Sequence, residues 1–297
     1  MENYLIKQGN STEHFFYKPY CGICVRKSSP RGTFSEHTQI IKTGKEPFSA
    51  IDTDDGCIHI ISTDNENNLV YAARKKDLWK SCILSKLPAD LIVHKTSLYL
   101  VRGRLNILYS ATFKGEILLI HCILAGHAKP RAVTKLMYPD FFVFKNNVYY
   151  TTPDGALGFT SLSDEKPLLC NRLYDNAHQV FLWENSGKEF IAFVRDSTLF
   201  INGREIVYDK MMEKPIFVSG KEQLYIMWKS GAFIKYIFSL NDASTWSGPL
   251  QFISSNHTPK IYALKHGNDT NFYYGIDNGK RIHLFGASDI FLSFTKI

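Results

Sequence analysis

The chain has 297 residues, of which 44% are hydrophobic and 21% charged, a balance that excludes a disordered protein. The formal net charge is +7, but the Lys and Arg residues are spread along the chain without the basic stripe or stacked-aromatic motif of a nucleic-acid module. We therefore expect no nucleic-acid partner. The aromatic fraction of 14% favours strands over helices.

The first residues, MENYLIKQGNSTEHFF, lack the basic start and long apolar core of a secretory signal. No apolar run reaches the roughly 20 residues of a membrane-spanning helix. The sequence thus predicts a cytoplasmic protein without membrane insertion. Most of the six cysteines lie in apolar runs, which favours reduced, buried thiols over a disulfide framework. They are Cys21, Cys24, Cys57, Cys82, Cys122 and Cys170.

A hairpin pattern recurs along the chain: an apolar strand with a central aromatic residue, a Gly/Asn/Asp turn and a second apolar strand. The spacing of roughly 34 to 48 residues is that of blade-sized repeats. In chain order the hairpins begin at Glu13, Cys57, Leu105, Asn147, Glu189, Gln223 and Asn271, and the first is the weakest copy.

Each hairpin lies between two further short apolar strands, so each repeat has four strands. The preceding strands begin at Tyr4, Phe48, Leu98, Phe141, Val180, Ile216 and Ile261, and the following ones at Thr38, Trp79, Arg131, Leu168, Glu205, Trp246 and Ile290. No sustained helical stripe is present. The sequence therefore predicts an all-β fold, a single domain over residues 1–297 that forms a seven-bladed β-propeller of four-stranded antiparallel blades. Six blades remain the alternative, if the N-terminal hairpin completes the final blade.

Stacked blades bury their faces against one another, which predicts that the aromatic residues of these strands pack between blades. The residues expected there are Phe48, Tyr71, Tyr109, Tyr149, Phe193, Tyr225 and Tyr273.

The stretch from Ser239 to Trp246, SLNDASTW, resembles the Asp-box, S-x-D-x-G-x-T-W, of sialidase-like propellers. Ser239, Thr245 and Trp246 match, whereas Asn241 replaces the Asp and Ala243 the Gly. The resemblance implies a turn between the third and fourth strands of a blade. In that turn a side-chain carbonyl would accept hydrogen bonds from backbone N–H groups, and the Trp would pack between sheets. RKKDLW from Arg74 to Trp79 keeps only the Trp of this motif.

The resemblance does not extend to sialidase chemistry. That family has an Arg-Ile-Pro motif and an arginine cluster, but the tripeptide is absent here and the arginines are scattered. We therefore expect no sialidase activity.

The metal-binding and redox patterns in the sequence are incomplete. Cys21 and Cys24 have C-x-x-C spacing, but no second pair follows and no helix is expected there. The histidines in predicted strands, His59, His121 and His283, show no metal-ligand spacing, and the acidic turn at Asp52, Asp54 and Asp55 lacks the later acidic ligand of a calcium loop. We therefore expect no metal and no cofactor.

Four residues are candidate ligand contacts. Arg102 and Arg104 flank Gly103 at a turn after an innermost strand, where paired guanidinium groups could bind a carboxylate or phosphate; a solvated charged turn is the alternative. Trp183 ends an innermost strand and Trp228 a second strand. Each could stack on a sugar or base, and inter-blade packing is the alternative.

No catalytic set emerges from these patterns, so we expect a non-catalytic binding or scaffold propeller that presents its channel face to a carbohydrate, peptide or protein. The alternative is a glycan-active enzyme, hydrolase or lyase, with carboxylates from different blades. Two Asp or Glu side chains about 5 to 10 Å apart at the channel mouth would favour the enzyme.

Overall fold

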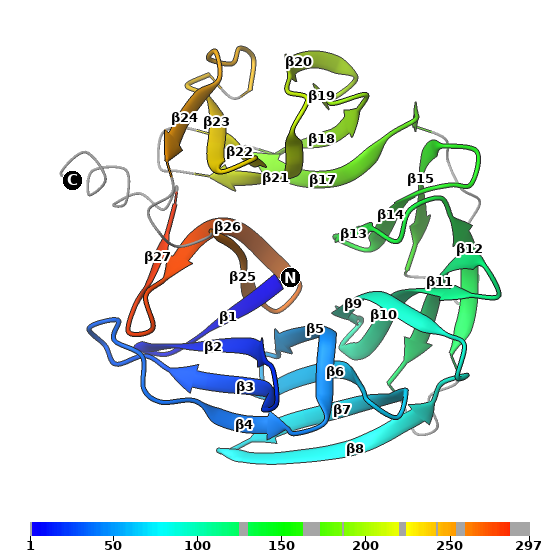
Figure 1. Cartoon of the computed structure of the whole chain (residues 1–297), viewed down its shortest axis with the longest axis vertical. Helices are drawn as coiled ribbons and strands as arrows, with labels where there is room; N and C mark the ends of the chain where they lie inside the picture. Colours follow the sequence, from blue (N-terminus) through cyan, green and yellow to red (C-terminus); the bar gives the residue numbers. More distant parts are fainter. Residues whose placement is uncertain are drawn as a thin grey trace.

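The computed structural model describes residues 2–124, 130–162, 173–185, 187–219, 224–241, 243–253 and 259–285. The elements of this described part are β-strands, which form sheets arranged in chain order around a common centre (Figure 1). Within it, no helix is long and apolar enough to cross a membrane.

Five sheets have four antiparallel strands each, with the first strand nearest the centre (Figure 1). They are β5 (Gly44–Asp52), β6 (Ile58–Asp64), β7 (Asn68–Lys75) and β8 (Leu78–Lys86); β9 (Ile92–Val101), β10 (Arg104–Phe113), β11 (Glu116–Ile123) and β12 (Arg131–Leu136); β13 (Phe141–Phe144), β14 (Asn147–Thr151), β15 (Ala156–Ser161) and β16 (Tyr174–Asp175); β17 (His178–Asn185), β18 (Lys188–Arg195), β19 (Thr198–Ile201) and β20 (Arg204–Tyr208); and β21 (Met212–Ser219), β22 (Leu224–Ser230), β23 (Phe233–Ser239) and β24 (Leu250–Ile253).

The sixth sheet contains both ends of the described chain. Its seven strands follow the order β27-β26-β25-β1-β2-β3-β4. β1 runs parallel to β25, with Tyr4 opposite Ala263, whereas the other pairs are antiparallel. The strands are β1 (Glu2–Gln8), β2 (Ser11–Lys18), β3 (Gly22–Lys27), β4 (Thr38–Ile41), β25 (Lys260–His266), β26 (Asp269–Asp277) and β27 (Ile282–Leu284).

The prediction of seven separate four-stranded blades is wrong, because the described strands form six sheets. The hydrophobic pattern located the strands but gave no sign that the innermost strands of the first and last repeats hydrogen-bond to each other. The alternative, in which the N-terminal hairpin joins the final repeat, is nearer to the observed pairing of β1 with β25.

The seven-stranded sheet is sharply folded. Arg26 on β3 and Asp277 on β26 are separated by four strand spacings, which would be roughly 19 Å in a flat sheet. Their side chains nevertheless form an ion pair of 2.7 Å. The two halves of the sheet therefore approach each other through their side chains.

Apolar clusters join each group of strands to the next around the ring. The cluster between β5–β8 and β9–β12 contains Ile51, Leu98 and Tyr109, and similar clusters occupy the junctions that follow. The aromatic residues predicted between blades all belong to these clusters: Phe48, Tyr109, Tyr149 and Phe193 are buried, and Tyr71, Tyr225 and Tyr273 are partly buried.

The turn between β23 and β24 is held by its own side chains. The Thr245 N–H donates to Asn241 Oδ1 at 2.9 Å, and the Ala243 N–H donates to Ser239 Oγ at 3.0 Å. Trp246 packs against the cluster between β17–β20 and β21–β24. These contacts hold the turn and fix Trp246 against the sheets.

Ala243 has a φ of 62°, a left-handed conformation that costs an L-residue with a Cβ about 1–2 kcal/mol. We expect Ala243→Gly to raise the free energy of unfolding by about 0.5–1 kcal/mol, because glycine relieves this strain but loses more chain entropy. Urea unfolding measures the change. Ala132→Gly in the exposed strand β12 is the control and should destabilise; a similar loss from both variants would contradict the expectation.

Candidate ligand-binding site

A pocket of about 50 Å³ lies where innermost strands converge. Its walls come from β1, β5, β9, β13 and the β25–β26 hairpin, which places it at the centre of the ring (Figure 1). The lining residues are Tyr4, Ser49, Lys95, Thr96, Ser97, Leu98, Tyr99, Phe141, Phe142, Val143, Lys265, Asn268, Thr270 and Phe272.

One wall of the pocket is the face of β9 that looks toward β13. Residues alternate between the two faces of a strand, so Lys95, Ser97 and Tyr99 share a face. Lys95 Nζ lies 2.5 Å from Asp140 Oδ1 and donates to the Phe141 carbonyl at 2.7 Å. These bonds tie the start of β9 to the start of β13.

Aromatic rings form the opposite side. The rings of Phe142 on β13 and Phe272 on β26 lie 6.1 Å apart between centroids, and both side chains are partly buried. Tyr4 on β1 packs edge-on against Phe48 at 5.2 Å. The pocket therefore combines flat apolar surfaces with hydroxyl, amide and ammonium groups.

The turn of the β25–β26 hairpin is fastened to β5 and β9. Asn268 Oδ1 accepts from the Leu100 N–H and its Nδ2 donates to the Leu100 carbonyl, each at 2.6 Å. The Gly267 N–H donates to Asp52 Oδ1 at 2.9 Å. The turn is thus held at the ends of β5 and β9.

Two buried hydroxyl oxygens at the β9 wall, Thr96 Oγ1 and Tyr99 OH, have no hydrogen-bond partner among the described residues. Burial also raises the pKa of Tyr99 far above its usual range, so this phenol stays protonated. A buried hydroxyl without a hydrogen-bond partner costs free energy.

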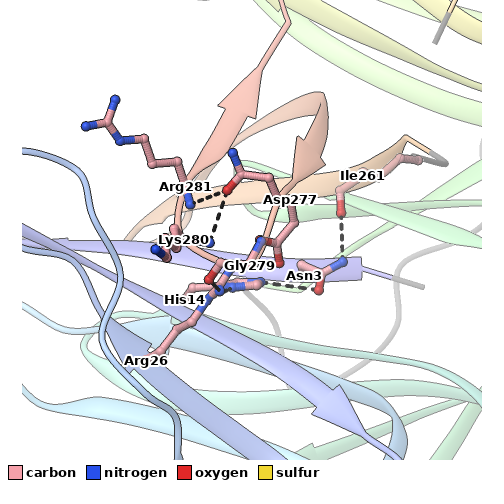
Figure 2. A network of polar contacts seen from close by, with 9 residues as sticks. Asn3, His14, Arg26, Ile261, Asp277, Gly279, Lys280 and Arg281 are labelled. Atoms are coloured by element: carbon pink, nitrogen blue, oxygen red, sulfur yellow. Dashed lines mark hydrogen bonds and ion pairs between the residues drawn. The ribbon is translucent and has the colours of Figure 1, made fainter. Parts of the chain in front are cut away.

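A second polar network supports the strand that carries Tyr4 (Figure 2). Arg26 donates to Asp277 Oδ2 at 2.7 Å, to the Gly279 carbonyl at 2.7 Å and to His14 Nδ1 at 3.0 Å. His14 in turn contacts Asn3 on β1. Asn3 and Tyr4 are adjacent and point to opposite faces of β1, so the network stabilises the strand from the side away from the pocket.

Burial and the neighbouring Arg26 lower the pKa of His14 to about 3. The neutral ring must accept at Nδ1, where Arg26 donates, so its proton is on Nε2, which lies 3.3 Å from Asn3 Oδ1. A neutral, fully bonded histidine of this kind is a structural group.

The two tryptophans predicted as possible ligand contacts lie in the core. Trp183 is 5% exposed and stacks on Phe217 at 4.2 Å between centroids, and Trp228 is 0% exposed and donates through Nε1 to Asp209 at 2.8 Å. Both belong to the cluster between β17–β20 and β21–β24. Their position corrects the idea of stacking on a ligand and agrees with the packing alternative.

Arg102 and Arg104 lie in and beside the turn between β9 and β10, and both are exposed. Among the described residues, no ion pair or hydrogen bond involves either guanidinium group. Arg102 follows Leu100 by two residues, which places it near the Asn268 clamp.

No group of three His, Cys, Asp or Glu side chains in the described part is arranged to hold a metal ion.

The described cysteines differ in burial. Three are buried (Cys24, Cys57 and Cys122), Cys21 is partly buried and Cys82 is exposed, so the expectation of buried thiols is wrong for Cys82. Cys170 lies outside the described residues. The three strand histidines differ, since His59 contacts Tyr71 and His121 contacts Asn106, whereas His283 is exposed.

Sequence reasoning missed most of the pocket. Lys95, Phe142, Lys265, Asn268 and Phe272 come from strands and a turn far apart in the chain. Their place on innermost strands could have identified them, because every second residue of such a strand faces the channel. This prediction would have required the correct pairing of the two chain ends.

Comparison with solved structures shows which fold this is. The lectin of Aleuria aurantia, described as a six-bladed β-propeller with a novel fucose recognition mode, has a TM-score of 0.51 at 11% identity over 95% of this chain and 89% of the lectin. The fold is that of a β-propeller. The BP39L lectin from Burkholderia pseudomallei gives a TM-score of 0.59 at 13% identity, over 95% of this chain and 94% of that protein.

An ulvan lyase from a polysaccharide lyase family also matches, with a TM-score of 0.51 at 10% identity over 95% of this chain and 91% of the lyase. No family model and no curated protein matches the sequence. At these identities the likeness concerns the propeller fold alone.

Proposed function

We propose that this chain is a binding propeller that takes a carbohydrate into the central pocket between β9 and β13. The observation that carries the proposal is the composition of the pocket wall, where the rings of Tyr4, Phe142 and Phe272 lie beside hydrogen-bonding side chains such as Ser97 and Asn268. Sites for small ligands typically combine apolar surfaces with a few convergent polar groups.

Sugar rings have one apolar C–H face and a periphery of hydroxyl groups, so they need both kinds of surface. An aromatic ring can cover the apolar face, and hydroxyl and amide groups can satisfy the sugar hydroxyls. Two of the structural neighbours are lectins, which is compatible with this proposal.

The alternative of a glycan-active enzyme needs a pair of carboxylates at the site. Among the described lining residues of the pocket there is no Asp or Glu. Asp140, just outside the lining, is bound to Lys95. We therefore propose binding without cleavage of the glycan.

A glycan array with the purified protein tests the proposal. We expect binding above background, and Phe142→Leu should weaken it by about tenfold, because leucine keeps the apolar volume but loses the flat ring. The control is Tyr20→Leu, which removes a fully exposed aromatic side chain from the β2–β3 turn and should leave binding unchanged. The proposal fails if no glycan binds, or if both variants bind as the wild type does.

A further inference from the structure

The described wall of the pocket carries two basic side chains. It contains Lys95 from β9 and Lys265 from β25, and none of its described residues is acidic. The negative charge of Asp140 lies beside Lys95 on the β13 side.

Two further cations stand at the end of β9. Val101 pairs with Arg104, so Arg102 and Gly103 form a two-residue turn, with φ values of 49° and 72°. Positive φ at both positions is the geometry of a tight hairpin turn, which fixes the direction of the backbone. The Asn268 clamp on Leu100 holds this end of β9 against the pocket wall.

The charges of Arg102 and Arg104 are not neutralised within the described part of the protein, where no acidic side chain pairs with them. Lys145 at the corresponding turn between β13 and β14 differs, because it pairs with both Glu184 and Glu189. The two arginines are thus available to a ligand.

We infer that the ligand is an acidic saccharide, whose carboxylate or sulfate group is bound by Arg102 and Arg104 while a sugar ring occupies the pocket. This inference rests on the proposed carbohydrate-binding function. Guanidinium groups present parallel N–H donors that match the oxygens of a carboxylate or sulfate, and such charge-assisted hydrogen bonds are stronger than neutral ones.

Calorimetric titration with three matched probes tests the inference: galacturonate oligosaccharides, the same oligosaccharides with their carboxyl groups reduced to alcohols, and sulfated galactose oligosaccharides. We expect the wild type to bind a charged probe at least about tenfold more tightly than the reduced one. The carboxylated and sulfated probes then distinguish which acidic group is recognised. Added salt should weaken binding of the charged probe.

The double variant Arg102→Gln/Arg104→Gln should lose this preference and bind the charged and reduced probes equally. The matched control is Lys27→Gln/Arg31→Gln, which removes two exposed positive charges from β3 and the loop after it and should keep the preference. A loss of preference in both variants would show a net-charge effect and overturn the inference.

The remaining outcomes separate the two proposals. Tight binding of the reduced probe, unchanged by the arginine variants, overturns the inference and leaves the carbohydrate-binding function in place. Absence of binding to any saccharide defeats both. Equal binding of single-stranded DNA would reveal a general polyanion surface and also overturn the inference.

Discussion

Replacement of Arg74 by methionine is expected to lower the free energy of unfolding by about 3–5 kcal/mol, because it leaves a buried carboxylate without its partner. Arg74 Nη1 on β7 lies 2.8 and 2.7 Å from the two carboxylate oxygens of Glu13 on β2. The side chain of Glu13 is 2% exposed and that of Arg74 13%. The guanidinium group also lies over the ring of Trp79, 5.5 Å from its centroid.

Urea unfolding of Arg74→Met and of the control Arg31→Met measures this effect. Arg31 is exposed, so its replacement should change the free energy of unfolding by less than about 0.5 kcal/mol. The double variant Arg74→Met/Glu13→Leu also removes the unpaired carboxylate, so it should recover part of the lost free energy of unfolding. If Arg74→Met is as stable as the wild type, the ion pair with Arg74 is not needed to keep Glu13 buried.

The second large effect is a loss of stability in mild acid that depends on His14. Burial and Arg26 lower the pKa of this histidine to about 3, against about 6.5 in an unfolded chain. Between these pH values the unfolded state binds a proton that the folded state does not. The stabilisation is therefore fully present above about pH 6.5 and declines by up to about 1.4 kcal/mol per pH unit as the pH falls toward 3.

Urea unfolding at about pH 7 and about pH 5 measures this dependence. His14→Gln should show a smaller loss between the two than the wild type, because glutamine cannot take up the proton. Some loss will remain, since burial also lowers the pKa of His121 to about 4. His283→Gln, an exposed site, is the control and should match the wild type. An unchanged pH dependence in His14→Gln would show that His14 is not held neutral.

Asp277 in the same network affects the stability of the fold in a lower pH range. Burial alone would raise its pKa, but hydrogen bonds from Arg26 and from the Gly279 N–H outweigh it and hold the pKa below its usual range. Its contribution is therefore present above about pH 4 and is lost only as the pH falls further. The pH range in which stability is lost therefore distinguishes the two groups.

Within the described residues the sequence predicted the strands well, because a half-buried strand alternates apolar and polar residues locally. The strands expected to begin at Leu168 and Ile290 lie outside the described residues. The hairpins beginning at Leu105 and Asn147 correspond to β10–β11 and β14–β15, and turn residues marked their ends. The number of sheets was wrong because the pairing of β1 with β25 is non-local. No residue in either strand indicates its partner.

The candidate site was less predictable than the fold. Arg102 and Arg104 stood out because they form a pair in a turn. Trp183 and Trp228 were ambiguous, since the same large ring can fill a core or cover a ligand, and only the packing decides between them. Phe142 and Phe272 come from different repeats and became neighbours only through ring closure.

The contact between β1 and β25 brings together residues about as far apart in the chain as the described part allows, with Asn3 Nδ2 donating to the Ile261 carbonyl across 258 positions. The apolar junctions between consecutive sheets can form one after another during synthesis, whereas this contact requires the closure of a very long loop. Tyr4 and Lys265 lie on these two strands and line the pocket. We therefore expect the pocket wall to be complete only after both ends of the described chain have been synthesised and have paired with each other.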